Sequence, residues 1–360
     1  TAEINPLFSD SVYIDRLSRI PAIMEMPYND IIRKFIDMYA GRLRNQVSFM
    51  LSACNFYMPI FEEALDAYGL PLELRYLPII ESALNPSAVS RAGASGLWQF
   101  MIGTGKIYGL ESNSLVDERR DPIKATWAAA RYLKEMYDIY GDWNLVIAAY
   151  NCGPGTINKA IRRANGETDY WKIYNYLPKE TRGYVPAFIA ANYVMTYYCD
   201  HNICPMETNI PASTDTVQVN KNLHFEQIAD LCNVPLDQIK SLNPQYKKQM
   251  IPGDSKPYTL RLPIDAISTF IDKQDTIYAH RADELFRNRK TVAVKEITPS
   301  TRKTTTAVAG KGKLTYYTIK SGDTLSTIAG KYGVTIKDIQ RWNGMSNTKI
   351  AAGKRLKIYK

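Results

Sequence analysis

The stretch YLPIIESALNPSAVSRAGASGLWQFMIGTGKIYG, residues 76–109, decides how this chain is interpreted. In it, Glu81 stands between an apolar run at residues 77–80 and the apolar pair at residues 83–84. A carboxylate in apolar surroundings loses hydration, which disfavours its charged form and raises its pKa. A general acid that works near neutral pH needs such a pKa. A lone glutamate is more often a solvent-exposed residue on a helix, so the flanks alone leave both interpretations open.

The residues after Glu81 predict a loop that is suited to a sugar ligand. The Asn-Pro pair at 85–86 ends the helix, because proline restricts its predecessor and has no N–H to donate. Residues 93–96, Gly-Ala-Ser-Gly, let the backbone approach a ligand closely. Trp-Gln-Phe at 98–100 offers aromatic faces and an amide. Further on, AYNCGPG at 149–155 predicts a helix end in a turn, for which a structural role is the more common one.

The fold is predicted to be mainly α, with a helical region over residues 1–205. The apolar residues between 125 and 140 follow the i, i+3, i+4, i+7 spacing of an amphipathic helix. Asp121-Pro122 predicts its N-cap and first position, and Pro186 is expected to open a buried segment over residues 188–198. We divide this region into an N-terminal extension at 1–50, packing on a catalytic domain at 51–205.

The rest of the chain predicts two small βααβ modules, at residues 213–263 and 314–360, joined by a helical segment and linker at 264–313. Residues 291–313 are rich in Thr, Lys, Ala and Ser and are expected to be linker. The modules form an internal repeat with a constant offset of 100 positions. It pairs Phe225, Ile228, Ala229, Val234, Ile239 and Asn243 with Leu325, Ile328, Ala329, Val334, Ile339 and Asn343.

Composition narrows the class of protein. The net charge of +9 favours anionic partners, although a solvated basic surface is the commoner explanation. Of the five cysteines, Cys199 and Cys204 could close a small disulfide loop in an oxidising compartment, with buried free thiols as the alternative. Three histidines and no HExxH motif predict no metal site, and no glycine fingerprint predicts a nucleotide cofactor.

The ordered motifs of the first 205 residues resemble those of the soluble-type lytic transglycosylases, and their flanks resemble the membrane-bound D-type subgroup. The motifs that carry the likeness are Glu81-Ser82, Ser90, Gly96-Leu97-Trp98-Gln99, Ala149-Tyr150-Asn151 and Tyr184. The two C-terminal modules resemble LysM domains. The resemblance implies a lysozyme-like fold that cleaves the β-1,4 bond between N-acetylmuramic acid and N-acetylglucosamine without water, leaves a 1,6-anhydromuramyl end and uses no cofactor.

The same resemblance implies roles for individual residues. Glu81 would be the acid and then the base. Ser90 and Gln99 would hold the substrate or its N-acetyl group. Trp98 stands where the family commonly has Met, and its expected role as a stacking face rests on its residue type. Tyr150 would hydrogen-bond and orient Glu81, Asn151 would shape the same wall, and Tyr184 would line the opposite side.

In the second module, the LysM pattern implies a glycan-binding set of Gly322, Asp323, Thr324, Leu325, Asn343 and Ile350. LysM modules hold N-acetylglucosamine-containing chains in a shallow groove between two loops. The first module has Lys-Asn-Leu-His at 221–224 where the second has Ser-Gly-Asp-Thr at 321–324, so only its fold is expected to be retained.

The number of carboxylates gives an independent check on the mechanism. Inverting and retaining glycosidases use two carboxyl groups, about 6.5–9.5 or 5–5.5 Å apart. No second acid accompanies Glu81 within the motif block. A single carboxylate suits a reaction in which the substrate supplies its own nucleophile. The alternatives are a hydrolytic muramidase with Asp117 or Asp121 as partner, a non-catalytic peptidoglycan binder and, last, a nucleic-acid binder, for which no recognition helix is found.

The expected partner is therefore the glycan strand of peptidoglycan and not nucleic acid, with the chain acting as a monomer. The start at Thr1 is compatible with a removed signal segment, with or without a lipid anchor, or with trimming. We expect a location in the bacterial cell envelope, in the periplasm, with an outer-membrane lipoprotein as the membrane-associated alternative.

Overall fold

The computed structural model describes residues 5–286, 314–320, 322–345, 347–348 and 350–359. It separates into two compact units, residues 1–297 and 298–360, which are treated individually below. The predicted linker at 291–313 lies outside the described residues. Among the described residues, no helix is both long and apolar enough to cross a membrane.

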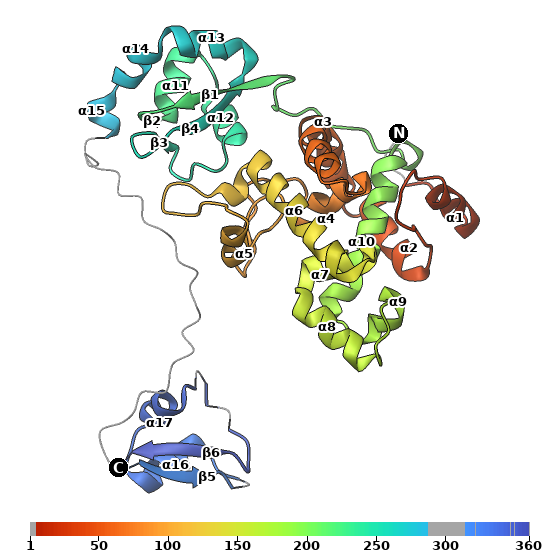
Figure 1. Ribbon diagram of the computed structural model, residues 1–360, viewed down its shortest axis with the longest axis vertical. Helices are drawn as coiled ribbons and strands as arrows, with labels where there is room; N and C mark the ends of the chain where they lie inside the picture. The colour runs from red at the N-terminus through yellow and green to blue at the C-terminus, as the bar shows by residue number, and fades with distance from the viewer. Residues whose placement is uncertain (1–4, 287–313, 321, 346, 349, 360) are drawn as a thin grey trace. The chain divides into compact units, whose positions relative to one another are not determined.

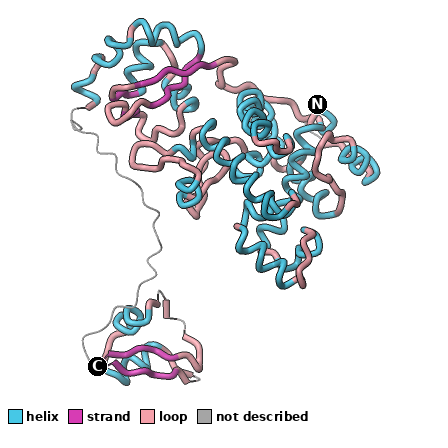
Figure 2. Tube along the Cα trace, viewed as in Figure 1, coloured by secondary structure: helices cyan, strands magenta, loops and turns pink. Residues whose placement is uncertain are grey.

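The first part of the chain is helical, as predicted, and encloses one hydrophobic core (Figures 1 and 2). Its helices are α1 (Asp10–Ser18), α2 (Asp30–Ala40), α3 (Arg44–Ala67), α4 (Leu77–Ser82), α5 (Ile102–Ile107), α6 (Pro122–Tyr140), α7 (Trp143–Cys152), α8 (Pro154–Arg163), α9 (Tyr170–Ile173) and α10 (Lys179–Thr196). Short 3-10 turns lie at Leu72–Tyr76, Glu118–Arg120, Tyr174–Tyr176 and Cys199–His201.

The predicted start of α6 is confirmed. The Asp121 side chain accepts hydrogen bonds from the backbone N–H groups of Ile123 and Lys124, at 2.9 and 3.0 Å, and Pro122 is the first helical residue. Gly141 ends the helix in the left-handed conformation, with φ of 62°. These contacts are the N-cap and C-cap arrangements that the residue types favour.

The prediction that Pro186 opens a helix is wrong, because Pro186 lies inside α10. Proline lacks the N–H that would bond to the carbonyl four residues earlier. That carbonyl, of Arg182, instead accepts a hydrogen bond from the Tyr170 hydroxyl at 2.9 Å. The helix therefore continues through the proline with its unpaired carbonyl satisfied by a side chain.

The first module follows the predicted βααβ order and adds two short strands. Its elements are β1 (Thr214–Val219), β2 (Asn222–His224), α11 (Phe225–Cys232), α12 (Leu236–Leu242), β3 (Met250–Pro252) and β4 (Tyr258–Pro263). β1 pairs antiparallel with β4, and β2 pairs antiparallel with β3. The helices that follow are α13 (Ile264–Asp272), α14 (Gln274–Ala279) and α15 (Ala282–Leu285). Phe270 of α13 and Ile277 of α14 lie in the core of this module.

The second module consists of β5 (Leu314–Thr318), α16 (Leu325–Tyr332), α17 (Ile336–Asn343) and β6 (Arg355–Tyr359), with β5 and β6 antiparallel. The predicted repeat extends to a shared side-chain clamp. In the first module, the Asn243 amide donates to the carbonyls of Ile239 and Arg261 and accepts from the Arg261 N–H. In the second, Asn343 makes the same bonds with Ile339 and Lys357. This amide ties the second helix of each module to its last strand.

All five cysteines are free thiols in the structure. Cys199 and Cys204 therefore form no disulfide in the structure, which agrees with the free-thiol alternative. Both side chains are exposed, rather than buried as the free-thiol alternative assumed.

Gly96 is the tightest point of the loop between α4 and α5. An added Cβ there would lie 1.8 Å from the carbonyl oxygen of Arg119, at a φ of +87°. Gly93 has nearly the same φ, +89°, yet an added Cβ would meet no heavy atom within 4 Å. Comparing Gly93 with Gly96 therefore separates the free-energy cost of a positive φ from that of a steric clash.

We expect Gly96→Ala to lower the free energy of unfolding by about 2 kcal/mol more than Gly93→Ala does. Gly93→Ala should cost about 1–2 kcal/mol for its backbone conformation alone, and overpacking adds about 1–3 kcal/mol. Urea denaturation of both variants measures the difference. Equal losses in the two variants would contradict the close approach of Arg119.

Candidate active site

A cleft of about 600 Å³ opens in the helical part of the chain, beside α4. Helices α2, α3, α4 and α10 and the loop after α4 supply its walls. The lining residues are Phe35, Met38, Tyr39, Leu43, Gln46, Met50, Ile79, Ile80, Glu81, Ser82, Ala83, Ala88, Val89, Ser90, Gln99, Glu180, Gly183, Tyr184 and Ala187. Sequence reasoning placed the N-terminal extension on the catalytic domain but did not anticipate that α2 lines the cleft.

Glu81 lies in the last turn of α4, with its carboxyl group in the cleft. Burial raises its pKa to about 7, because the charged form loses hydration. The Tyr184 hydroxyl donates a hydrogen bond to the carboxylate and opposes this rise, while the negative charge of Glu180 adds to it. Desolvation is the largest of the three effects, so Glu81 is poised between its two protonation states near neutral pH.

The backbone next to Glu81 is fixed from the loop side. The Ser82 hydroxyl bonds to the carbonyls of Pro78 and Leu97, at 3.0 and 2.9 Å. Ala83 and Leu84 then end the helix with φ of 51° and 57°, a left-handed conformation uncommon outside glycine. The carboxylate is thus carried on a short helix whose end is hydrogen-bonded to the loop that faces it.

Ser90 and Gln99, on the loop between α4 and α5, both line the same cleft as Glu81. The Gln99 amide donates to the carbonyls of Gly96 and Ala88, at 2.8 and 3.3 Å, and its backbone has a φ of 49°. The Ser90 hydroxyl accepts from the Ala94 N–H at 3.0 Å and remains exposed. The roles predicted for both residues on substrate stay predictions.

Two of the aromatic assignments need correction. The Trp98 side chain is 0% exposed, and its ring N–H donates to the Thr126 hydroxyl at 2.9 Å. It therefore has no face to offer a sugar ring and belongs to the core. The Tyr150 hydroxyl donates to the Trp98 carbonyl at 2.7 Å, so the direct hydrogen bond to Glu81 comes from Tyr184 instead.

The carboxylates considered as partners of Glu81 lie elsewhere. Asp117 is 1% exposed and pairs with Arg119 at 2.8 Å, and Asp121 caps α6. A residue that sequence reasoning missed, Glu180 at the start of α10, lines the cleft and acts electrostatically on Glu81. It is about one hundred residues from Glu81 in sequence, so no local spacing could have paired the two. Asn151 accepts a hydrogen bond from Thr181 at 2.9 Å, one residue away from Glu180.

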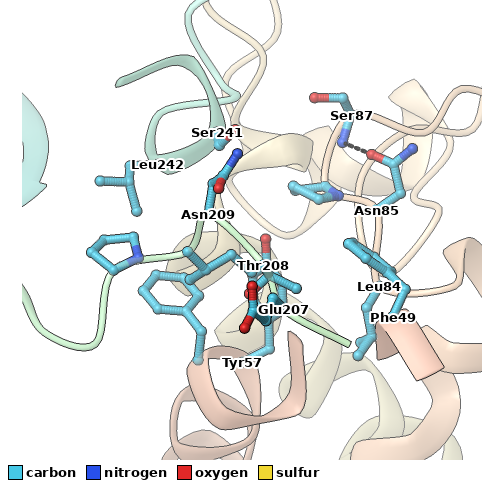
Figure 3. A pocket seen from close by; sticks show the side chains of 14 residues that line it. Phe49, Tyr57, Leu84, Asn85, Ser87, Glu207, Thr208, Asn209, Ser241 and Leu242 are labelled. Carbon is cyan, nitrogen blue, oxygen red and sulfur yellow. Dashed lines mark hydrogen bonds between the residues drawn. The ribbon is translucent and has the colours of Figure 1, made fainter. Parts of the chain in front are cut away.

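A second hollow, of about 540 Å³, is lined by Leu84 and Asn85 just after the end of α4 (Figure 3). Phe49, Tyr57 and Leu84 supply apolar walls. Residues 207–211, which precede the first module, and Ser241 and Leu242 of α12 close the hollow. The Asn85 side chain is turned back to accept from the Ser87 N–H at 2.9 Å. None of the residues predicted to act on substrate lines this hollow.

In the second module, some of the predicted glycan-binding residues make structural contacts and others are exposed. Leu325 is buried in the hydrophobic core, and Asn343 uses its amide in the clamp described above. Asp323 accepts from the Tyr317 hydroxyl and the Lys320 N–H, both at 2.8 Å, and Thr324 caps α16. Gly322 is exposed, with φ of 90°, and Ile350 packs against the edge of the core. Glycan binding by this set stays a prediction.

Comparison with known proteins identifies three matching families along the chain. The transglycosylase SLT domain matches residues 58–173, the LysM-like domain of lytic transglycosylase MltD matches 213–279, and the LysM domain matches 317–358. The chain is 32% identical over 341 residues to membrane-bound lytic murein transglycosylase D of Escherichia coli K12, covering 93% of this chain and 70% of the relative.

Other similarities cover smaller shares of the chain. The soluble lytic murein transglycosylase of Escherichia coli K12 is 33% identical over 124 residues, which is 33% of this chain and 19% of the relative. The solved structure of the 70 kDa soluble lytic transglycosylase of Escherichia coli aligns with 29% identity and a TM-score of 0.35, over 42% of this chain and 26% of the other.

The raised pKa of Glu81 makes stability depend on pH. The folded-state pKa of about 7 exceeds the ordinary 4.5, so between these values the native state binds a proton that the unfolded state releases. Relative to Glu81→Gln, the wild type should be most stable below pH 4.5 and lose roughly 3 kcal/mol as the pH rises through 7. Urea denaturation of both proteins from pH 4 to 8 tests this, and a pH-independent difference would contradict it.

Tyr184→Phe should raise the pKa of Glu81 above its wild-type value of about 7, because the lost hydroxyl favours the charged carboxylate. A ¹³C NMR titration of the Glu81 carboxyl carbon measures the change. Tyr150→Phe is the matched control, since its hydroxyl donates to a backbone carbonyl. An equal change in the Glu81 pKa in both variants would contradict a specific effect of the Tyr184 hydrogen bond.

Proposed function

We propose, for a chain that belongs to the family of membrane-bound lytic murein transglycosylase D, that Glu81 is the single acid and base of its reaction. The family assignment makes the protein a lytic murein transglycosylase with LysM modules that bind peptidoglycan. The observation that carries the proposal is the carboxyl group of Glu81 in the cleft, with a pKa of about 7. A group near that pKa can both give and take a proton at neutral pH.

In the first step, protonated Glu81 gives its proton to the glycosidic oxygen as the bond from that oxygen to the muramyl anomeric carbon breaks. In the second step, the 6-hydroxyl oxygen of the same muramyl residue bonds to the anomeric carbon, and its proton goes to the Glu81 carboxylate. Glu81 ends protonated, no water is consumed, and the product carries a 1,6-anhydro ring.

The neighbours of Glu81 fit this double use. The Tyr184 hydrogen bond stabilises the carboxylate that exists between the two steps. The charge of Glu180 favours the protonated form that starts the cycle, and a carboxylate in the cleft also favours a positively charged sugar. Ser90 and Gln99, which line the opposite wall, are proposed to hold the substrate.

We also propose the predicted domain division: extension 1–50, catalytic domain 51–205, modules 213–263 and 314–360, and the intervening segment 264–313. The separate hydrophobic clusters support the boundaries between the helical part and the two modules, while the extension and the catalytic domain share one cluster. Side chains of α13 and α14 belong to the hydrophobic core of the first module. This favours an end of that module at about residue 280 instead of 263.

The enzyme acts in the cell envelope. We propose the periplasm as the compartment, a lipid anchor in the outer membrane as its attachment, and a monomer as its working form. The similarity to a membrane-bound relative supports attachment to a membrane. Fractionation of cells that express the natural full-length protein, followed by sedimentation of the purified enzyme, is the measurement that tests these points.

Digestion of purified murein sacculi should yield products that end in the anhydro sugar, one water lighter than hydrolysed ends. Glu81→Gln should reduce the rate by roughly 10²- to 10⁴-fold, because one group supplies both proton transfers. Mass spectrometry of the released fragments and the rate of their release are the two measurements.

Glu180→Gln is the discriminating control. If Glu180 only tunes Glu81 electrostatically, this variant still releases anhydro ends, at a lower rate. If wild-type ends were hydrolysed and depended on Glu180, the chain would use two carboxylates and water, and the single-residue mechanism would be lost.

A further inference from the structure

The first module contacts the helical domain through a backbone pairing as well as through side chains. The Asp117 N–H donates to the Gln245 carbonyl at 2.9 Å, and the Lys247 N–H donates to the Leu115 carbonyl at 2.8 Å. Val116 and Tyr246 form the antiparallel bridge between these two bonds. Residues 111–118 of the helical domain are thus joined to the segment between α12 and β4, through residues that precede β3.

The side chains at this contact are those of a protein interior. Leu115 and Val116 are 3% and 0% exposed and belong to the hydrophobic core of the first module. The Lys247 ammonium donates to the Asn113 carbonyl at 2.7 Å and lies 4.0 Å from the Asp117 carboxylate. The Tyr258 hydroxyl lies 3.0 and 3.2 Å from the two oxygens of Glu111. Segment 111–118 therefore completes the core of a module that lies more than one hundred residues later.

The same loop is closed against the other loop of its own module. β3 pairs with β2, and an added Cβ on Gly253 would lie 2.3 Å from the carbonyl oxygen of Lys221. Leu223 and Ile251, which face each other in this pairing, are both 0% exposed. The two loops are therefore in contact with each other through their backbones and through these buried side chains.

From the docked segment, a chain of buried contacts runs to the active-site loop. Asp117 makes two hydrogen bonds of 2.8 Å to the Arg119 guanidinium. The same guanidinium donates to the carbonyls of Gly93 and Phe100, at 2.8 and 3.0 Å. Between those carbonyls lie Gln99, which lines the cleft, and the Leu97 carbonyl, which holds Ser82 beside Glu81.

We propose that the first module is a brace for the active site: by holding residues 111–118, it sets the position of the 93–100 loop opposite Glu81. Lys247 is its principal positioning residue, because it bonds to Asn113 and neighbours the Asp117 that orients Arg119. The proposal rests on the proposed roles of Glu81 and the loop residues in catalysis. It gives the first module a role in turnover that does not depend on glycan binding.

The test compares Lys247→Ala with Lys248→Ala in the full chain, on purified sacculi. Lys248 is the matched control, because it has the same charge, is adjacent in the loop and is exposed. We expect Lys247→Ala to lower kcat about three- to tenfold at a temperature where it is fully folded, with anhydro products retained. Lys248→Ala should match the wild type. Lys247→Arg, which restores a donor and a positive charge, should recover at least half of the loss.

A merely structural contact gives a different pattern: a lower midpoint of thermal unfolding with wild-type kcat and KM below it. That pattern, or a loss that Lys247→Arg and Lys248→Ala share equally, overturns the brace. If Lys247→Ala does not fold, Tyr258→Phe replaces it, since it removes only the hydroxyl that bonds to Glu111. If wild-type products carry no anhydro end, the proposed function fails, whereas the ratio of variant to wild-type rates still decides on the brace.

Discussion

The buried guanidinium of Arg119 is the interaction on which the arrangement of this enzyme depends. Its side chain bonds to one carboxylate, that of Asp117, and to two loop carbonyls, those of Gly93 and Phe100. Its own carbonyl lies so close to Gly96 that no side chain fits between them. A charge at this depth is stable only when its donors are satisfied, so the loop, the acidic partner and the arginine constrain one another. The loop at residues 93–100 belongs to no regular strand, and hydrogen bonds from this one side chain help to fix its backbone.

Around Glu81, opposing effects of unequal size determine the chemistry. Burial favours the neutral acid, the Tyr184 hydroxyl favours the anion, and Glu180 favours the neutral acid again. Because desolvation is the largest effect, the net result is a carboxyl group that titrates near neutral pH rather than near 4.5. The hydrogen bond by itself lowers the pKa and favours the carboxylate, whereas burial by itself raises the pKa and favours the neutral acid. The combination supports both roles in one turnover.

The sequence was sufficient where the determining interaction is local. The cap at Asp121 and the helical period of α6 lie within a few residues of the features that they predict, and the pattern of each module lies within that module. The assignments that failed depend on contacts distant in sequence. Pro186 is tolerated because of Tyr170, Trp98 is buried by α3 and α6, and Glu180 reaches the cleft through the packing of α10. Apolar flanks around Glu81 indicated its burial, but nothing near it could indicate which tyrosine would bond to it.

The asparagine clamp shared by the two modules has a consequence for how a duplicated unit can diverge. Asn243 and Asn343 hold helix and strand together through backbone atoms, whose chemistry is the same whatever side chains the loops carry. Loop sequences can therefore drift without unfolding the unit. In one copy that freedom allowed the loops to join each other and a neighbouring domain; in the other, the loop bearing Gly322 remained exposed. A scaffold that is fixed where helix meets strand and unconstrained at its loops allows two similar units of one chain to make different contacts.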